Sequence, residues 1–187
     1  MGTSSIIVIA LIVVVAVVAI ALAVKARRSQ KLKSRFGPEY ARAIEQTGNK
    51  SRAEAKLEKL EKRVQHFDLT PLSLSAREQF VAEWQKIQSR FVDDPQGALM
   101  EADQLIQKIM TTRGYPLTDF EQRAADISVD HPVVVEHYRA GHEIALRHAQ
   151  GSASTEDLRQ AMIHYRTLFN ELTGQPEMAR VATAARA

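Results

Sequence analysis

One stretch near the N-terminus constrains the fold of this chain more than any other feature. Ile6 to Val24 is a run of nineteen isoleucine, valine, leucine and alanine residues without a polar side chain. As an α-helix it measures about 28 Å at about 1.5 Å per residue, close to the roughly 30 Å hydrocarbon core of a bilayer. Its apolar side chains cover every face, which argues against a helix packed on a globular core. The run therefore predicts a transmembrane helix over residues 6–24, preceded by a short tail of residues 1–5.

Two other interpretations of the N-terminus fit the residues less well. A cleavable secretory signal has a basic start and an apolar core of about 7 to 15 residues. Here residues 1–5 carry no charged side chain and the apolar core is longer, although Ala21-Leu22-Ala23 resembles a cleavage site, so cleavage stays open as an alternative. N-myristoylation requires serine or threonine at the position that Ile6 occupies. The residues of the N-terminus therefore favour a membrane anchor.

A basic juxtamembrane segment follows the apolar run. Residues 25–35 carry six positive side chains and no acidic one, whereas residues 1–5 carry no charged side chain. Positive charge favours the cytoplasmic side of a membrane, so we expect the C-terminal part of the chain in the cytoplasm. Each basic side chain near an anionic leaflet adds about 1 kcal/mol of attraction. The residues expected at the membrane surface are Lys25, Arg27, Arg28, Lys31, Lys33 and Arg35.

The remainder of the chain is slightly acidic. The chain has 25 lysine and arginine residues against 22 acidic ones, and removing the six of residues 25–35 leaves 19 against 22. A nucleic-acid-binding protein carries its basic excess on the folded domain, so nucleic acid is not an expected partner. The absence of cysteine excludes disulfide bonds, thiolate metal sites and cysteine nucleophiles.

Beyond residue 35, apolar residues recur at helical spacing, and no credible run of alternating strand residues is present. We therefore predict an all-α fold, with a helical-bundle domain of four main helices over residues 36–173 and a disordered tail over residues 174–187. The expected helix starts are Pro38, the capping boxes that begin at Ser51, Ser75 and Thr118, the pairs Asp94-Pro95 and His131-Pro132, and Ser154.

Two apolar stripes stand out within this domain. Phe80, Trp84, Ile87 and Phe91 share one helix face and are expected in the core. The other stripe has the two-in-seven spacing of a coiled-coil seam, but it is too short for a coiled-coil assignment by spacing alone, and docking on the rest of the domain is the alternative. Its members are Ala53, Leu57, Leu60, Val64 and Phe67.

Polar side chains concentrate around the two helix breaks between residues 113 and 142. Functional groups often lie on connections that a rigid scaffold holds, so this stretch is the candidate polar site. The alternative is a hydrogen-bonded network that satisfies helix ends and fixes how helices cross. The candidate residues are Arg113, Tyr115, Asp119, Arg123, Asp126, Asp130, His131 and His142.

Recognised motifs for metal binding and catalysis are missing from the sequence. His142-Glu143 begins like a zinc-protease motif, but Leu146 stands where the second histidine should be. Histidines three helical turns apart, such as His131 and His142, are about 16 Å apart along the axis, too far to share one zinc ion. No glycine loop for phosphate and no nucleophile elbow is present. The sequence therefore predicts no cofactor, no metal and no catalytic residue.

Four further motifs are Phe36-Gly-Pro-Glu-Tyr40, Phe91-Val-Asp-Asp-Pro95, Arg113-Gly-Tyr-Pro116 and Ile127-Ser-Val-Asp-His-Pro132. With them the chain resembles an uncharacterised bacterial family whose members have one N-terminal membrane segment and a helical domain. The resemblance runs from the apolar run to about Leu172. It implies a bacterial origin and this architecture, and it brings no activity, ligand or catalytic residue.

Three functional hypotheses follow. The leading one is a non-enzymatic, single-pass inner-membrane protein whose helical domain binds another protein or a second copy of itself. The second is a membrane-tethered enzyme or small-ligand sensor that uses the polar residues between 113 and 142. The third is membrane maintenance through the basic segment, which predicts binding to vesicles that weakens with salt.

Overall fold

The computed structural model describes residues 2–174, with side chains in the N-terminal helix described from Leu11 onward. Over this range the chain is all-α as predicted, with no strand. The predicted disordered tail lies outside the described residues except for Gly174. The helices are α1 (Thr3–Phe36), α2 (Pro38–Thr47), α3 (Lys50–Val64), α4 (Leu74–Arg90), α5 (Pro95–Thr112), α6 (Phe120–Ser128), α7 (Val134–Ala149) and α8 (Thr155–Leu172).

The chain forms two compact units, Met1–Glu58 and Lys59–Ala187, and the division falls inside α3. The predicted start of the folded domain at residue 36 therefore lies within the first unit. In that unit, α1 ends at Phe36, and Gly37 has a φ of +49° that lets the chain turn into α2 at Pro38. The start of α2 at Pro38 matches the sequence prediction.

Polar contacts attach α3 to the basic part of α1. The Arg28 guanidinium forms a bidentate ion pair with the Glu58 carboxylate, and the Ser29 hydroxyl donates to Glu54. The C-terminal end of α1 also contributes to a small core, because Leu32 and Phe36 are buried. One side of the basic segment therefore packs against α2 and α3 and has a structural role.

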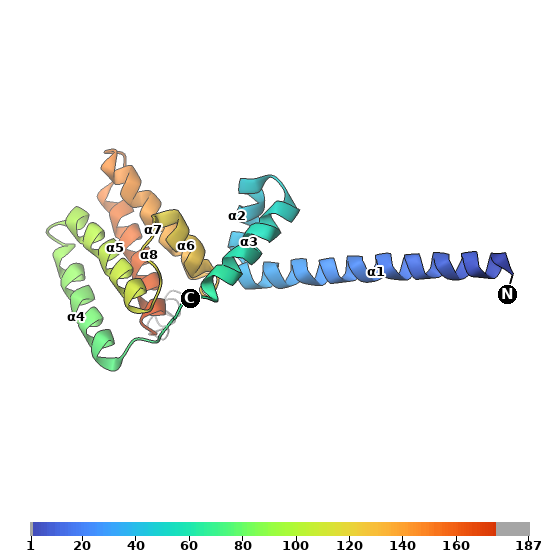
Figure 1. Cartoon of the computed structure of the whole chain (residues 1–187). Helices are drawn as coiled ribbons and strands as arrows, with labels where there is room; N and C mark the ends of the chain where they lie inside the picture. Colours follow the sequence, from blue (N-terminus) through green and yellow to red (C-terminus); the bar gives the residue numbers. More distant parts are fainter. Residues whose placement is uncertain (1, 175–187) are drawn as a thin grey trace, which may run out of the picture. The chain divides into compact units, whose positions relative to one another are not determined.

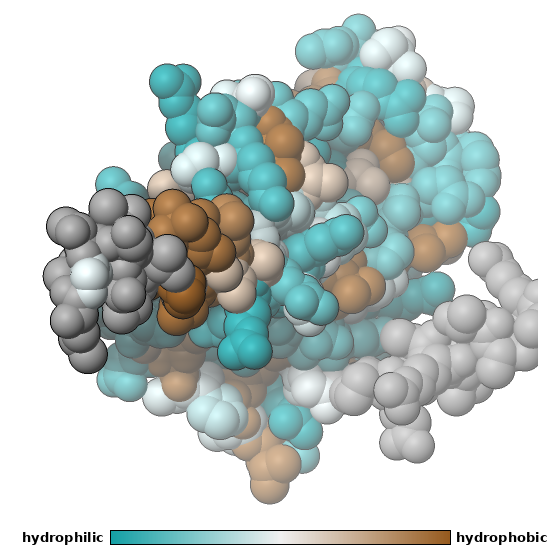
Figure 2. Space-filling view, turned by 90° about the vertical axis from the view of Figure 1, so that its right-hand side faces the viewer, coloured by the Kyte–Doolittle hydropathy of each residue, from teal (hydrophilic) through white to brown (hydrophobic). Residues whose placement is uncertain are grey.

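The described side chains of α1 up to Arg28 are exposed on all sides of the helix. Every residue from Leu11 to Arg28 is exposed, and the large apolar side chains among them keep between 52% and 65% of their surface accessible. Figure 2 shows these brown side chains gathered along the described part of α1. Among the described residues, none of the helices has the length and apolar character needed to cross a membrane.

The second unit is built around α8. This helix packs against both α5 and α7, while α4 packs on α5 and α6 on α7 (Figure 1). Phe80, Trp84 and Ile87 of α4 are buried as predicted, and Phe91 is partly buried against the same core. The largest fully buried side chains of this unit include Tyr138, Tyr165, Phe169, Ile106 and Ile109.

The stripe with coiled-coil spacing faces inward. Ala53, Leu57 and Val64 are at most 4% exposed, and Phe67 is partly buried against the core of the second unit. Within the described part of the chain, these side chains are therefore occupied by the chain's own packing. This burial agrees with the docking alternative.

Three of the expected helix caps are displaced by one or two residues. Ser73, not Ser75, caps α4 by accepting from the amide of Ala76 at 3.1 Å. Asp119, not Thr118, caps α6 by accepting from the amide of Gln122 at 2.9 Å. In each case two neighbouring residues could act as caps, and the backbone selects the one whose side-chain oxygen reaches a free amide.

Of the remaining caps, one is displaced and two lie at the predicted residue. Asn49, not Ser51, accepts from the amide of Arg52 at 3.1 Å at the start of α3. Asp94 caps α5 and Ser154 caps α8 as predicted, the latter in a reciprocal capping box with Asp157. The helix expected from His131-Pro132 begins at Val134, because those two residues form a preceding turn.

Candidate functional site

The eight polar residues predicted as one site lie in different places of the fold. One group surrounds Tyr115, because the charges of Arg113, Asp126 and Asp130 all act on the pKa of its phenol. Arg123 and His142 belong to a second group, where both lie near Asp103. The structure therefore does not gather all eight predicted residues around one point.

Asp126 is the most buried acid of the first group. It is 1% exposed, and its Oδ1 accepts from Arg63 Nε at 3.1 Å and from Gln122 Nε2 at 2.8 Å. Its Oδ2 is buried without a hydrogen-bond partner among the described residues. Because Arg63 comes from the C-terminal end of α3 and Asp126 from α6, this ion pair ties two helices together.

Tyr115 is buried against the segment after α3. Its ring meets Phe67 edge-on with centroids 6.2 Å apart, and its hydroxyl has no partner among the described residues. Burial raises the pKa of Tyr115 to about 12, and the charge of Asp130 adds to that rise. The phenol therefore stays protonated at neutral pH. We interpret the Tyr115 group as a packing and ion-pair network around the 113–116 turn.

The second group is a buried chain of hydrogen bonds between four helices. Arg123 Nε of α6 donates to the Tyr138 hydroxyl of α7 at 3.2 Å. The Tyr165 hydroxyl of α8 donates to Asp103 Oδ1 of α5 at 3.2 Å, and Tyr138 is also hydrogen-bonded to Asp103. Burial, followed by the charge of Asp103, raises the pKa of both tyrosines far above neutral pH. Both phenols are therefore donors to the carboxylate.

This network reaches the surface at a groove with a volume of about 340 Å³, which we call the α5–α7–α8 groove. Such a volume is within the range of small-molecule sites. One wall is mainly apolar and the other residues are amides and ionisable groups. The lining residues are Gln96, Leu99, Met100, Asp103, Gln104, Gln107, His142, Ala145, Leu146, His148, Ala149 and Tyr165.

Asp103 dominates the charge of this groove. No lysine or arginine is among its described lining residues, and the Asp103 carboxylate is half-buried. Burial lowers the pKa of His142, because desolvation penalises the imidazolium and outweighs the attraction of Asp103. His142 is therefore neutral at pH 7 and lies flat on the Phe120 ring, with centroids 3.5 Å apart. The groove therefore presents the Asp103 carboxylate beside one mainly apolar wall, and this carboxylate already accepts hydrogen bonds from Gln107 Nε2 at 2.6 Å and from the Tyr165 hydroxyl at 3.2 Å.

A second histidine of the groove has unused hydrogen-bonding capacity. The Nδ1 atom of His148 is buried and has no partner among the described residues. A neutral imidazole can donate or accept at this atom, depending on its tautomer. Because this atom is buried, it is not open to a ligand, and Asp103 is the charged group that the groove presents.

The two remaining predicted residues have structural roles. Asp119 caps α6, as described above. His131 Nδ1 lies 2.9 Å from the Glu171 carboxylate, which ties the turn before α7 to the end of α8. Among the described residues, no group of three or more potential ligands is placed to hold a metal ion.

Sequence reasoning placed one residue of this groove, His142, in the candidate site and missed Asp103 and Tyr165. Asp103 resembles any surface acid on an amphipathic helix, and its partner Tyr165 is 62 residues away in the chain. The one available signal was a tyrosine within the apolar stripe of α8, since a buried phenol usually requires a partner.

Comparisons with known proteins give no match: no family model fits the chain, and no curated protein or solved structure is similar to it. The resemblance to a bacterial family therefore stays a prediction from its motifs.

Proposed function

We propose that this chain is a single-pass protein of a bacterial inner membrane, held by residues 6–24, whose helical domain binds another protein or a second copy of itself. One observation carries the membrane part of the proposal. Large apolar side chains from Leu11 to Val24 are exposed around α1, each by more than half of its surface. A bilayer would remove this area from water at about 25 cal/mol per Å².

The charge of the following segment supports the orientation. Lys25, Arg27, Lys31 and Lys33 are exposed directly after the apolar run, while residues 1–5 carry no charged side chain. A cytoplasmic C-terminal domain keeps these cations beside the anionic inner leaflet.

Alkaline carbonate treatment of membranes from cells that produce the full chain tests the anchor. The chain should stay in the pellet, and a reporter fused after Ala187 should be active only in the cytoplasm. Recovery of a chain trimmed after Ala23 from a soluble fraction would overturn the proposal and favour the cleaved-signal alternative.

The interaction part of the proposal is supported by apolar surface on the folded domain. Met100 of α5 is 59% exposed and Leu146 of α7 is 52% exposed, and both line the α5–α7–α8 groove. Exposed apolar side chains that gather beside a groove are typical of interaction surfaces. Light scattering and cross-linking of the detergent-solubilised chain test this part. A monomer that captures no partner, and whose behaviour is unchanged by Met100→Glu and Leu146→Glu, would count against it.

A second candidate function is a membrane-tethered sensor of a small ligand. It is favoured by the Asp103 carboxylate in the groove, which lies beside one mainly apolar wall and has no lysine or arginine among its described lining neighbours. Such a site suits a small organic cation, with an ammonium group on the carboxylate and an apolar body on Met100 and Leu146. This candidate replaces the 113–142 cluster with the groove as the binding place.

A further inference from the structure

A second groove lies within the first unit, where α1 meets the start of α3. Its volume is about 450 Å³; α1 contributes one side of it, and Asn49 with the first turns of α3 contributes the other. We call it the α1–α3 groove. Its lining residues are Leu22, Lys25, Ala26, Ser29, Asn49, Lys50, Ser51 and Glu54.

The floor of this groove is a rigid, buried carboxylate. Glu54 accepts hydrogen bonds from the hydroxyls of Ser29 and Tyr40, and its side chain is 8% exposed. Burial alone would raise the pKa of Glu54. The hydrogen bonds from Ser29 and Tyr40 lower it, and together with the nearby lysines they outweigh burial, so the net shift of the pKa is downward. Glu54 is therefore ionised at neutral pH, and its contacts fix the start of α3 on α1.

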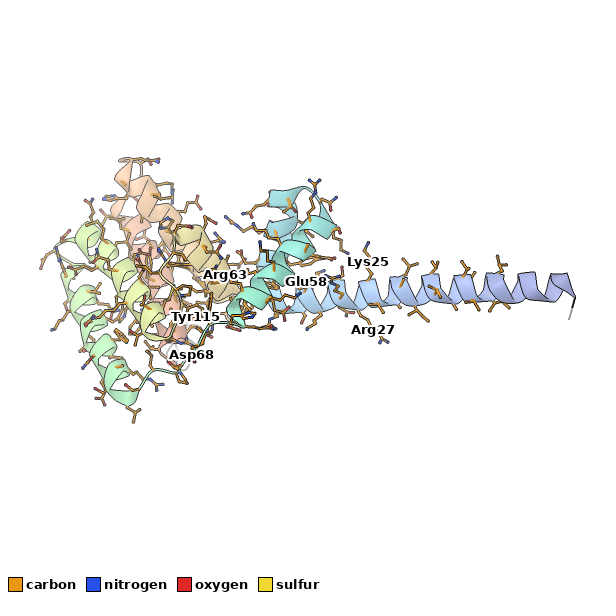
Figure 3. All side chains as sticks on the ribbon, in the orientation of Figure 1. Lys25, Arg27, Glu58, Arg63, Asp68 and Tyr115 are labelled. Carbon is orange, nitrogen blue, oxygen red and sulfur yellow. The ribbon has the colours of Figure 1, made fainter. Side chains whose placement is uncertain are left out.

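The accessible charge of the groove is positive. Lys50 Nζ lies 3.9 Å from Glu54, and its side chain keeps 61% of its surface exposed. Lys25 adds a second cation from α1, on the side that faces α2 and α3, whereas Arg27 projects from the opposite side in Figure 3. Two lysines against one carboxylate leave a net charge of +1, which complements a singly charged phosphodiester.

The position of the groove along α1 identifies the kind of anion. Leu22 belongs to the last turn of the apolar run and is 63% exposed, while Lys25 is the first basic residue after it. If residues 6–24 span the bilayer, as proposed above, this point of α1 is at the depth of the lipid phosphates. An anion that fits here has a phosphate for the lysines and an acyl chain for Leu22.

We propose that the α1–α3 groove binds the headgroup of an anionic phospholipid. Its phosphate lies between Lys25 and Lys50, and its acyl chains lie along the apolar part of α1. Asn49 uses its carbonyl oxygen to cap α3, which leaves its amide nitrogen as a donor beside the Ser51 hydroxyl for the headgroup. The lipid would join α1 and α3 at the membrane surface.

Native mass spectrometry of the full chain in detergent tests this proposal, with phosphatidylglycerol or phosphatidylcholine added as the probe. The expected result is one bound phosphatidylglycerol that phosphatidylcholine does not replace. The double variant Lys25→Gln, Lys50→Gln should weaken that binding by about tenfold or more. A control double variant, Arg27→Gln, Lys56→Gln, removes the same charge from the same two helices outside the groove and should change it by less than about twofold.

Three outcomes would overturn the proposal. Equal loss in the two double variants would mean that the basic segment attracts lipid only diffusely. Equal binding of both lipids would remove the need for an anionic headgroup. Soluble glycerol phosphate binding as tightly as the lipid would make the site one for a free phosphate. Carbonate extraction of the same proteins separates this proposal from the anchor: a chain that stays in the membrane without lipid selectivity defeats only the groove, whereas an extracted chain defeats both.

Discussion

The rings of Trp84 and Phe169 stack almost parallel, with centroids 4.9 Å apart and planes 13° from each other. Trp84 comes from α4 and Phe169 from α8, so the pair closes the core on the side away from α7. Trp84 is the chain's one tryptophan and is 4% exposed. Its fluorescence therefore reports directly on the folding of the second unit.

Removing the stacked ring should destabilise this unit strongly. Phe169 is 1% exposed, and Phe169→Ala leaves a cavity beside the indole, for which we expect a loss of about 3–5 kcal/mol. Phe169→Leu fills most of that volume and should cost clearly less. Urea unfolding followed by Trp84 fluorescence measures both. A cost below about 1 kcal/mol for the alanine variant would mean that the pair is not part of the core.

Gly114 should not tolerate a side chain. Its φ is +97°, and a Cβ atom would lie 2.2 Å from the carbonyl oxygen of Asp68. Because the clash is with backbone, Gly114→Ala should cost at least about 3 kcal/mol. Gly151→Ala is the matched control, because Gly151 has a φ of +71° but open space around it, so only strain of about 1–2 kcal/mol applies. Equal losses in the two variants would contradict the clash.

The hydroxyl of Tyr115 should be dispensable for folding. It is buried without a partner among the described residues, so Tyr115→Phe should leave stability unchanged or raise it by about 1 kcal/mol. The folded-state pKa is raised to about 12 from 10, so in the native protein stability falls as pH rises above 10, where the unfolded phenol ionises first. The variant should lose less stability over that range.

Tyr138→Phe provides the comparison, because the Tyr138 hydroxyl accepts a hydrogen bond from Arg123. That variant should be destabilised, since it leaves the buried Arg123 without this acceptor. If Tyr115→Phe is the more destabilised of the two, the Tyr115 hydroxyl has a partner in solution.

Acid should weaken the second unit through His142. Burial lowers the folded-state pKa of His142 below 6.5, so the unfolded state binds the proton more readily. Stability is therefore greatest above 6.5 and is lost as pH falls through that value toward the folded-state pKa. His142→Gln should reduce the fall in Tm between about pH 7 and about pH 5. His66→Gln, at an exposed position on the segment after α3, should leave it unchanged.

Helices were predictable where apolar residues recur at helical spacing, as in α4 and α8, and Pro38, Asp94 and Ser154 mark starts that local geometry determines. The displaced caps were not predictable to the residue. Ser73 and Ser75 carry the same hydroxyl, and Thr118 and Asp119 are both residues that cap helices, with Asp the more favoured of the two. The choice between them depends on how the following helix packs, which the local sequence does not contain.

The candidate site was less predictable, for a related reason. The polar stretch between residues 113 and 142 is real, but its side chains diverge because α6 and α7 carry them to different neighbours. Asp126 meets Arg63 of α3, whereas Arg123 meets the Tyr138 and Asp103 network. Long-range partners of this kind decide which polar residues share a site, and one sequence does not reveal them.

We expect the α5–α7–α8 groove to prefer a positively charged ligand. If Asp103 is a recognition group, benzylammonium should raise the Tm of the full chain, because its ammonium pairs with the carboxylate and its ring covers Met100 and Leu146. Benzyl alcohol and benzoate have the same ring without the positive charge and should have little effect. Asp103→Asn should abolish the shift while its side-chain oxygen can still accept from Tyr165.

Glu136→Gln is the control for this experiment, because it removes one acidic charge at an exposed position of α7 outside the groove. It should leave the benzylammonium shift intact. A shift that disappears in both variants would reflect the overall charge of the protein. A shift that survives in Asp103→Asn would show that the amine binds elsewhere. The groove would then have no role in binding an amine, and the proposal that it contacts a protein partner would remain.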